Sequence, residues 1–182
     1  MGLHERFILR RVNATEIDKQ FLCYFVRDET ISRVWRVLND TKELVNVNYK
    51  EQWNREDLEK RSLGLIETIN NNGIVVAAFD KKQVIAFASI EGHAIGTNQD
   101  YRQLSQFHVS SQYRNKGVGK ALFKCVEENA RNLQIQKLYI SSSSSEHTLR
   151  FYESVGCVDA KEVNQALAQK EPFDIQLEYS IK

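Results

Sequence analysis

The sequence predicts one α/β domain built around a mixed sheet. From residue 74 onward, short β-rich runs alternate with segments whose apolar residues recur every three or four positions, which indicates strands alternating with helices. The predicted order is strand, helices, hairpin, strand, helix, strand, helix, strand, which is typical of an α/β fold with a mixed sheet. The 182 residues, 42% hydrophobic and 27% charged, suit a single globular domain with a proper core.

The bulk composition also excludes several classes of protein. A net charge of +1 lacks the basic bias that nucleic-acid binding requires. No apolar stretch has the length of a signal-peptide core or of a transmembrane helix. The cysteines are odd in number and far apart in the chain, which favours a reducing compartment: Cys23, Cys125 and Cys157. We therefore expect a cytoplasmic protein with neither a membrane nor a nucleic acid as partner.

The first third of the chain reads as a strand followed by helices. "RFILRRV" at 6–12 predicts a short strand. Residues 14–72 are rich in Glu, Lys, Arg and Leu, which favours helices with breaks near 28–30 and 46–54, ending at Gly73. Four aromatic residues of this region are candidates for the core or for a substrate pocket: Tyr24, Trp35, Tyr49 and Trp53.

The middle of the chain predicts three strands. "GIVVAAFDKKQVIAFASIEG" at 73–92 holds two β-rich runs joined by the polar "DKKQ", which predicts a hairpin. "YRQLSQFHVS" at 101–110 predicts another strand. Its apolar alternation is interrupted, as a bulge would require.

The last third predicts two helices and two strands. Apolar residues recur at helical spacing from Val118 to Leu133, and "KLYIS" follows as a strand. We expect the serine run at 141–145 to form a flexible polar connection. "EHTLRFYESVG" predicts a helix closed by Gly156, and "FDIQLEYSI" predicts the final strand.

The stretch "RNKGVGK" at 114–120 places two glycines between a strand and a helix. Unpaired N–H groups at a helix N-terminus attract anions, and glycine lets a ligand approach the backbone closely. Three cationic residues surround the turn: Arg114, Lys116 and Lys120. The turn therefore predicts a phosphate site, and a plain glycine turn with solvated lysines is the alternative.

Two common phosphate motifs fail at this turn. A P-loop needs glycine where Arg114 stands, and it needs Ser or Thr where Ala121 stands. A dinucleotide fingerprint needs a small residue where Leu122 stands. An ATP-binding or dinucleotide-binding protein is therefore disfavoured.

Residues 114–119 match the pattern Gln/Arg-x-x-Gly-x-Gly/Ala, and "SSEHTLRFYESVGCVDA" at 144–160 follows at a suitable distance. Together they resemble the acyl-CoA signature and the later Asn-x-x-Ala-x-x-Phe/Leu-Tyr-Glu-x-x-Gly-Phe element of the GNAT superfamily of N-acetyltransferases. Two positions depart from that element, because Ser145 replaces a frequent asparagine and Cys157 a frequent phenylalanine. The resemblance covers roughly residues 74–180.

The resemblance implies a mostly antiparallel central sheet flanked by helices and acetyl-CoA as cosubstrate, with no metal. It implies that the cofactor lies along these residues: Phe107, His108, Val109, Arg114, Asn115, Lys116, Gly117, Val118, Gly119, Lys120, Ser145 and Tyr152. Tyr152 would protonate the departing thiolate, since a phenol stays protonated at neutral pH. A backbone N–H near Val109 would stabilise the oxyanion.

The general base is not assigned by the resemblance. Relatives place a glutamate where Gln103 or Ile140 stands here. Two other candidates remain, Glu91 and His108, beside a water chain that ends at backbone carbonyls. A solvated strand end for Glu91 and a core position for His108 are the alternatives.

Other chemistry finds no support in the motifs. The four histidines show no metal-ligand spacing, and no Gly-x-Ser-x-Gly elbow is present. We expect residues 1–182 to form one domain, with a helical acceptor-side region at 14–72 and an acyl-CoA-binding core at 74–182.

The predicted function is transfer of an acetyl group from acetyl-CoA to a primary amine by direct attack. The acceptor is either a small-molecule amine or a peptide or protein amine, and a homodimer is in keeping with the family. The alternative is a catalytically idle CoA-binding domain with a regulatory or interaction role.

Overall fold

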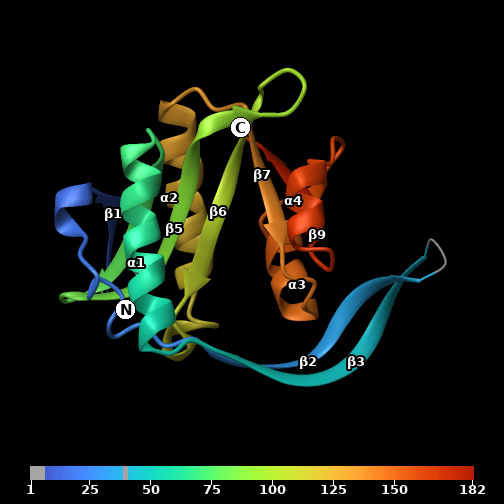
Figure 1. Ribbon diagram of the computed structural model, residues 1–182, viewed down its shortest axis with the longest axis horizontal. Coiled ribbons are helices and arrows are strands. Elements are labelled where there is room, and N and C mark those ends of the chain that lie inside the picture. Colours follow the sequence, from blue (N-terminus) through green and yellow to red (C-terminus); the bar gives the residue numbers. More distant parts are fainter. Residues whose placement is uncertain (1–6, 39–40) are drawn as a thin grey trace.

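The computed structural model describes residues 7–38 and 41–182 of the chain. One seven-stranded sheet forms its centre, in the order β1-β4-β5-β6-β7-β9-β8 (Figure 1). The strands in this order are β1 (Ile8–Val12), β4 (Ile74–Asp80), β5 (Gln83–Ile95), β6 (Tyr101–Val109), β7 (Lys137–Ser142), β9 (Ile175–Ser180) and β8 (Val158–Asp159). Of these described strands, β6 and β7 alone pair in parallel, so the predicted mixed, mostly antiparallel sheet is confirmed.

Helices cover both faces of the sheet (Figure 1). On one face, α1 (Arg55–Asn70) packs Leu58 and Leu65 against Val75, Ala77 and Phe87 of the sheet. The other face carries α2 (Val118–Asn132) and α3 (Glu146–Ser154), which share a second apolar cluster with β4 to β9. The remaining helical segments are short: Ala14–Glu16, Ser111–Tyr113 and α4 (Gln165–Lys170).

The strands β6 and β7 pair at one end and separate at the other. Their ladder joins Tyr101–Gln103 to Lys137–Tyr139 and goes no further, while β6 stays paired with β5 as far as Val109. Figure 1 shows the two strands diverging below this point. The facing edges of 104–109 and 140–142 therefore have no strand between them.

The predicted bulge in β6 is confirmed. Ser89 faces Gln106 and Ile90 faces Leu104, so Ser105 is an extra residue in the β6 strand. A bulge bends a strand and redirects its side chains. Here it turns β6 just past the point where its ladder with β7 ends.

The predicted helices over residues 28–52 are wrong. These residues form a long antiparallel hairpin of β2 (Asp28–Leu38) and β3 (Thr41–Gln52), which projects away from the sheet (Figure 1). The pattern of β-branched and aromatic residues with a period of two, such as Val45, Val47 and Tyr49, was masked by neighbouring charged helix formers. Trp35 and Tyr49 consequently lie on strands.

The serine run differs from expectation as well. Ser142, Ser144 and Ser145 are buried, and the N–H of Trp35 donates to the carbonyl of Ser144 at 2.8 Å. The run therefore ties the hairpin to the start of α3 and is not a loose connection. The short elements α4 and β8 were not predicted, because neither carries a run long enough to show a period.

Candidate active site

A cleft of about 730 Å³ lies at the open end of the splay between β6 and β7. Its walls come from the end of β6, the glycine turn, the base of the hairpin and the start of α3. The residues that line it are Arg27, Glu29, Phe107, His108, Val109, Arg114, Asn115, Gly117, Gly119, Lys120, Glu146, His147, Thr148, Arg150, Phe151 and Tyr152. The structure thus brings together the glycine turn, the end of β6 and Tyr152, as the two motifs predict.

The glycine turn has the geometry of an anion site. Gly117 is the N-cap of α2 and adopts φ +80°, and Asn115 also adopts a left-handed φ of +58°. No side chain caps α2, so the first N–H groups of the helix stay available to a ligand. The helix dipole and Lys120 favour an anion at this point.

Gly119 allows close packing behind the turn. A Cβ atom at this position would lie 3.1 Å from the ring of Phe151, which is tighter than ordinary contacts. Phe151 in turn stacks on Phe107 with ring centroids 5.2 Å apart. The glycine therefore lets α2 approach the aromatic residues at the back of the cleft.

The end of β6 offers a free backbone edge to the cleft. The N–H of Ser110 donates to the carbonyl of Ile85 on β5 at 2.8 Å. Successive peptide groups of a strand point to opposite sides, so the peptide groups of Val109 and Phe107 point away from β5 and into the splay. The carbonyl of Val109 accepts from Arg114 Nε at 3.3 Å, which leaves the N–H of Val109 and the peptide groups of Phe107 for an extended ligand arm to pair with, as a missing strand would.

Tyr152 stands opposite this edge. Its side chain is 6% exposed, and its ring lies 6.0 Å from that of Phe107. Burial raises its pKa well above 10, so the phenol is protonated throughout the neutral range. No described residue hydrogen-bonds to the hydroxyl, which is therefore free to serve as a proton donor.

His108 projects from β6 toward the α1 face and lines the same cleft. Its ring lies edge-on to Trp53 at 4.7 Å and is tilted against Phe87 at 5.3 Å. Burial and the nearby guanidinium groups of Arg27, Arg61 and Arg114 hold its pKa well below 6.5. The imidazole is therefore neutral at neutral pH.

An arginine–glutamate network, which the sequence reading missed, closes the hairpin side of the cleft. Glu29 accepts from Arg27 at 3.0 Å and from Arg114 at 3.1 Å, and Arg27 also pairs with Glu51 at 2.6 Å. Arg27 Nε and Arg114 Nη2 are buried and have no partner. Arg27 and Glu29 would have been recognisable only if 28–38 had been read as a strand, with both side chains on one face.

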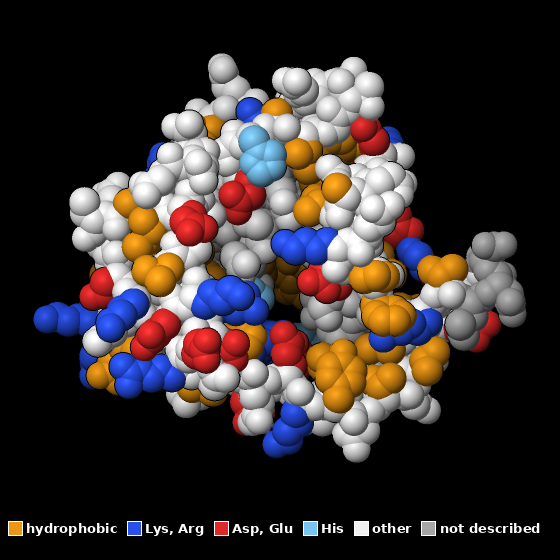
Figure 2. Space-filling view, viewed as in Figure 1, with side chains coloured by type: hydrophobic (Ala, Val, Ile, Leu, Met, Phe, Trp, Pro, Cys, Tyr) orange, Lys and Arg blue, Asp and Glu red, His pale blue; other side chains and the backbone are white. Residues whose placement is uncertain are grey.

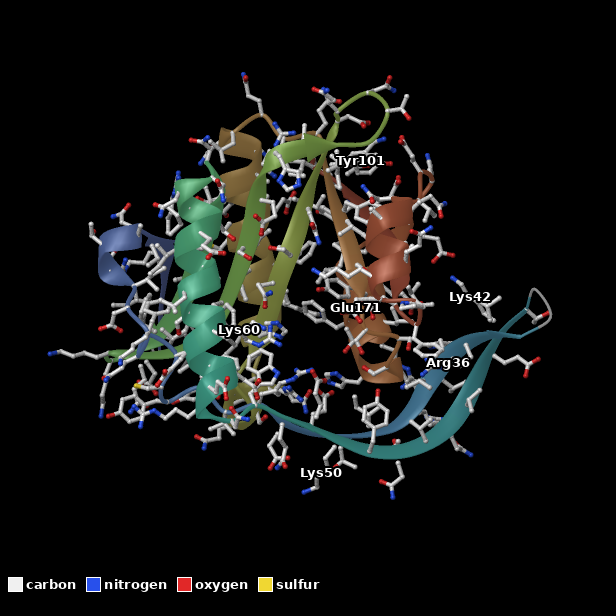
Figure 3. The ribbon with its side chains drawn as sticks, in the orientation of Figure 1. Arg36, Lys42, Lys50, Lys60, Tyr101 and Glu171 are labelled. Carbon is white, nitrogen blue, oxygen red and sulfur yellow. The ribbon has the colours of Figure 1, made fainter. Side chains whose placement is uncertain are left out.

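Glu91 lies in a different cleft, of about 650 Å³, between α1 and the end of α4. Its Oε1 atom accepts from Thr68 at 3.1 Å and from Ser105. Figure 2 shows this face hollowed between the α1 and α4 sides, with charged groups of both signs around it. In Figure 3, Lys60 of α1 and Glu171 beyond α4 stand on opposite sides of the gap, and both line the cleft.

Three predicted cofactor residues do not line the main cleft. Val118 is buried in the apolar cluster, and Lys116 bonds to the carbonyl of Gln112 at 2.7 Å. Ser145 caps α3, donating to Thr148 Oγ1 at 2.7 Å and accepting from its N–H. Their contact with a cofactor stays a prediction, which this geometry supports least for the hydroxyl of Ser145.

Two absences apply to the described part of the chain. In the two described ranges, 7–38 and 41–182, no three His, Cys, Asp or Glu side chains are grouped so as to hold a metal ion. Within the same ranges, no helix has the length and apolar character needed to cross a membrane.

Several solved structures have a similar fold at low identity. Nourseothricin acetyltransferase aligns with a TM-score of 0.69 and 14% identity, over 97% of this chain and 99% of that chain. A proposed streptothricin acetyltransferase from Bacillus anthracis str. Ames, in complex with acetyl coenzyme A, gives 0.68 and 17%, over 97% and 99%. Aminoglycoside 6′-N-acetyltransferase complexed with coenzyme A gives 0.55 and 16%, over 70% and 81%.

No curated protein matches the sequence significantly. The profile of the Acetyltransferase (GNAT) family, however, matches residues 38–157, which is more than half of the chain. The match includes the end of β6, the glycine turn and the helix that carries Tyr152. The chain therefore belongs to the GNAT family of acetyltransferases.

Proposed function

We propose that the protein transfers an acetyl group from acetyl-CoA to a primary amine by direct attack. The observation that carries the proposal is a single cleft in which the free edge of β6 runs from the glycine turn to Tyr152. Acetyl-CoA bound in similar folds supports this cosubstrate. The compartment that we propose is the cytoplasm, whose reducing conditions suit the three free thiols at Cys23, Cys125 and Cys157.

The residues present fit acetyl-CoA. The uncapped N–H groups at Gly117–Gly119 and the cation of Lys120 would hold the pyrophosphate. The outward peptide groups of Phe107 and the N–H of Val109 would pair with the amides of the pantetheine arm. The bound thioester supplies the activated acetyl group.

The chemistry divides between two sides of the cleft. A neutral amine attacks the thioester carbonyl, and a backbone N–H at the end of β6, near Val109, stabilises the negative charge that develops on its oxygen. Tyr152 gives its proton to the departing thiolate, and burial, which raises its pKa, keeps the phenol protonated at neutral pH until the thiolate forms. A buried donor that faces the reacting atoms contributes typically 10²–10⁴-fold to the rate.

The attacking amine must first lose a proton, because an ordinary amine of pKa near 10 is about 99.9% protonated at pH 7. Of the two candidate bases, His108 shares the cleft with Tyr152 and the free edge of β6, whereas Glu91 lies in the neighbouring cleft. We assign the base to His108 on this ground. Glu91 is left as a carboxylate that attracts the cationic acceptor.

The acceptor is a small-molecule amine or a peptide or protein amine. The neighbouring cleft at Glu91 is lined mainly by polar and charged residues, which suits a hydrophilic acceptor. The fold resembles those of nourseothricin acetyltransferase and aminoglycoside 6′-N-acetyltransferase, so nourseothricin and aminoglycosides are the first amines to screen. Polyamines and a lysine-containing peptide complete the screen.

Calorimetric titration with acetyl-CoA, followed by a thiol-release assay with each amine, tests the proposal. We expect binding of acetyl-CoA in the micromolar range, no binding of ATP, and release of CoA with at least one amine. Gly117→Trp should abolish acetyl-CoA binding while the far-UV circular dichroism stays unchanged.

Each failure has its own meaning. Binding without transfer to any amine would favour the idle CoA-binding domain. Absence of binding by a folded protein would overturn the cofactor assignment. Tighter binding of ATP than of acetyl-CoA would assign the glycine turn to a nucleotide.

A further inference from the structure

The side chain of Gln106 connects the two clefts. Its Oε1 atom lies 3.1 Å from Nη1 of Arg61 and 3.0 Å from Nε2 of His108. Gln106 and Arg61 line the Glu91 cleft, while His108 lines the cleft that contains Tyr152. One amide oxygen therefore contacts a cation on one side and the proposed base on the other.

These two contacts fix the protonation pattern of the imidazole. A guanidinium has only donors, so the atom of Gln106 that faces Arg61 must be the amide oxygen and not the amide nitrogen. That oxygen can only accept, so Nε2 of His108 must carry the proton. A neutral imidazole protonated at Nε2 has its lone pair at Nδ1.

The lone pair at Nδ1 is left without a hydrogen bond in the described part of the protein. No described residue hydrogen-bonds to Nδ1, and the atom is not among the buried polar atoms that lack a partner. His108 is one of the residues that line the main cleft, and Nδ1 is its ring nitrogen without a partner in the described protein. Nδ1 is therefore the ring atom able to accept a proton from a molecule in the cleft.

Packing holds this arrangement in place. The guanidinium of Arg61 lies 3.8 Å from the centroid of the Trp53 ring, and Trp53 packs edge-on to His108. Phe87 closes the other side of the imidazole. Arg61 thus contacts two of the groups that touch His108, namely the amide of Gln106 and the indole of Trp53.

The charges that face His108 come from several elements. Arg61 approaches from α1, Arg27 from the segment before β2, and Arg114 from the glycine turn. The carboxylates of Glu29 and Glu51 are paired with two of these arginines, Arg27 and Arg114. The three guanidinium groups therefore favour the neutral imidazole, and they favour release of a proton that the imidazole has accepted.

We propose that Gln106 and Arg61 are positioning residues that hold His108 as the Nε2–H tautomer, so that Nδ1 takes the proton of the attacking amine. The N–H bond of the ammonium breaks as the Nδ1–H bond forms, and the imidazolium then releases that proton to water in the cleft. The catalytic half of this inference rests on the proposed function, while the tautomer is a property of the protein alone.

Nitrogen NMR of the histidine-labelled protein at pH 7.5 tests the tautomer without any substrate. We expect His108 to show a protonated Nε2 and an unprotonated Nδ1, with its signals identified among the four histidines by their loss in His108→Phe. In Gln106→Leu the Nε2–H preference should be lost. A wild-type His108 protonated at Nδ1, or an unchanged tautomer in Gln106→Leu, would overturn the positioning role.

Kinetics with the identified amine test the consequence. Gln106→Leu should lower kcat about tenfold, the usual worth of one hydrogen bond, with KM for acetyl-CoA unchanged. Gln106→Glu keeps an acceptor for both donors and adds a negative charge, so kcat should recover and the acid limb of the pH profile should move to higher pH. Gln83 is exposed, so Gln83→Leu is the matched control, and its kcat should equal that of the wild type.

An unchanged kcat in Gln106→Leu would remove the residue from the mechanism. If no amine is acetylated at all, the proposed function fails, and with it the catalytic half of the inference. The NMR result would still decide whether Gln106 sets the tautomer.

Discussion

The ring of Tyr152 on α3 lies 6.0 Å from the ring of Phe107 on β6, at an interplanar angle of 54°. The contact spans the splay, because β6 and β7 share no ladder beyond Gln103 and Tyr139. Phe151 adds a stacked contact to Phe107. Aromatic packing therefore replaces strand pairing here and fixes the distance between the phenol and the free edge of β6.

Tyr152→Phe should separate chemistry from binding. The ring and its contacts remain, so acetyl-CoA should bind with wild-type affinity, whereas loss of the proton donor should lower kcat about 100-fold. Calorimetry and steady-state kinetics on the same preparation measure the two quantities. A variant that acetylates at the wild-type rate would show that the thiolate leaves without this acid.

Gly117 and Gly156 form a matched pair. Both adopt a left-handed backbone, at φ +80° and +96°, but only Gly117 lines the cleft. Replacing either by valine should cost stability of about 1–2 kcal/mol through backbone strain. Only Gly117→Val should also lose acetyl-CoA binding in calorimetry. Equal loss of affinity in Gly156→Val would attribute the effect to strain and not to the turn.

The cofactor half of the fold was predictable because its periodic patterns are local. Strands β4 to β7 and β9 and helices α2 and α3 appear where the sequence indicates them. Hairpin β2–β3 was not predictable in the same way, since its stability comes from cross-strand pairs such as Val34 with Val45 and Trp35 with Leu44. The frequent Glu, Lys and Arg of this segment favour a helix locally, and tertiary pairing overrides them.

The site was predictable where it depends on consecutive residues. The turn at 114–120 and Tyr152 each belong to a short motif, which is why the sequence could single them out, and the structure places both at one cleft. The network of Arg27, Glu29 and Arg114 joins residues more than 80 positions apart and depends on the unpredicted hairpin. The link from Gln106 to His108 skips one residue along a strand, a step that alternation alone would not single out.

Glu91→Gln should leave the chemical step largely intact. The substituted amide retains an oxygen for the hydroxyls of Thr68 and Ser105, so the local structure should persist. With His108 as base, kcat should change by less than about tenfold, while KM for a cationic acceptor should rise as the carboxylate charge is lost. Steady-state kinetics over pH 6–9 measure both. If Glu91→Gln lowered kcat about 100-fold or more and also removed the acid limb of the pH profile of kcat, Glu91 would be identified as the base.

Acidification should destabilise the protein through His108. Its folded pKa lies below the ordinary value of 6.5, so the unfolded chain binds the proton first as the pH falls. This contribution is fully present above about pH 6.5 and is lost toward the folded pKa, with a slope of at most about 1.4 kcal/mol per pH unit. Urea unfolding at pH 7.5, 6 and 5 measures it.

The quantity to compare between variants is the slope of unfolding free energy against pH, and not the unfolding free energy at one pH. His108→Asn should show a shallower loss of unfolding free energy on acidification than the wild type. Exposed His93→Asn is the control and should follow the wild type. Identical slopes in His108→Asn and the wild type would show that the imidazole is not held neutral.

Tyr101→Phe should weaken the closed end of the splay. The Tyr101 hydroxyl donates to Glu178 Oε2 at 2.6 Å, and both residues are 2% exposed. Burial and this carboxylate raise the pKa of Tyr101 to about 12. Without the hydroxyl, the N–H of Lys161 is the one donor that the described residues leave to Glu178 Oε2, and the loss should cost about 1–3 kcal/mol.

Thermal unfolding measures the effect, at roughly 2–4 °C per kcal/mol for a chain of this size. Tyr24→Phe is the matched control, because Tyr24 is 68% exposed and its hydroxyl has no partner among residues 7–38 and 41–182. A midpoint equal to the wild type in Tyr101→Phe would mean that water replaces the lost donor. The buried carboxylate would then be no constraint on the point where β6 and β7 begin to diverge.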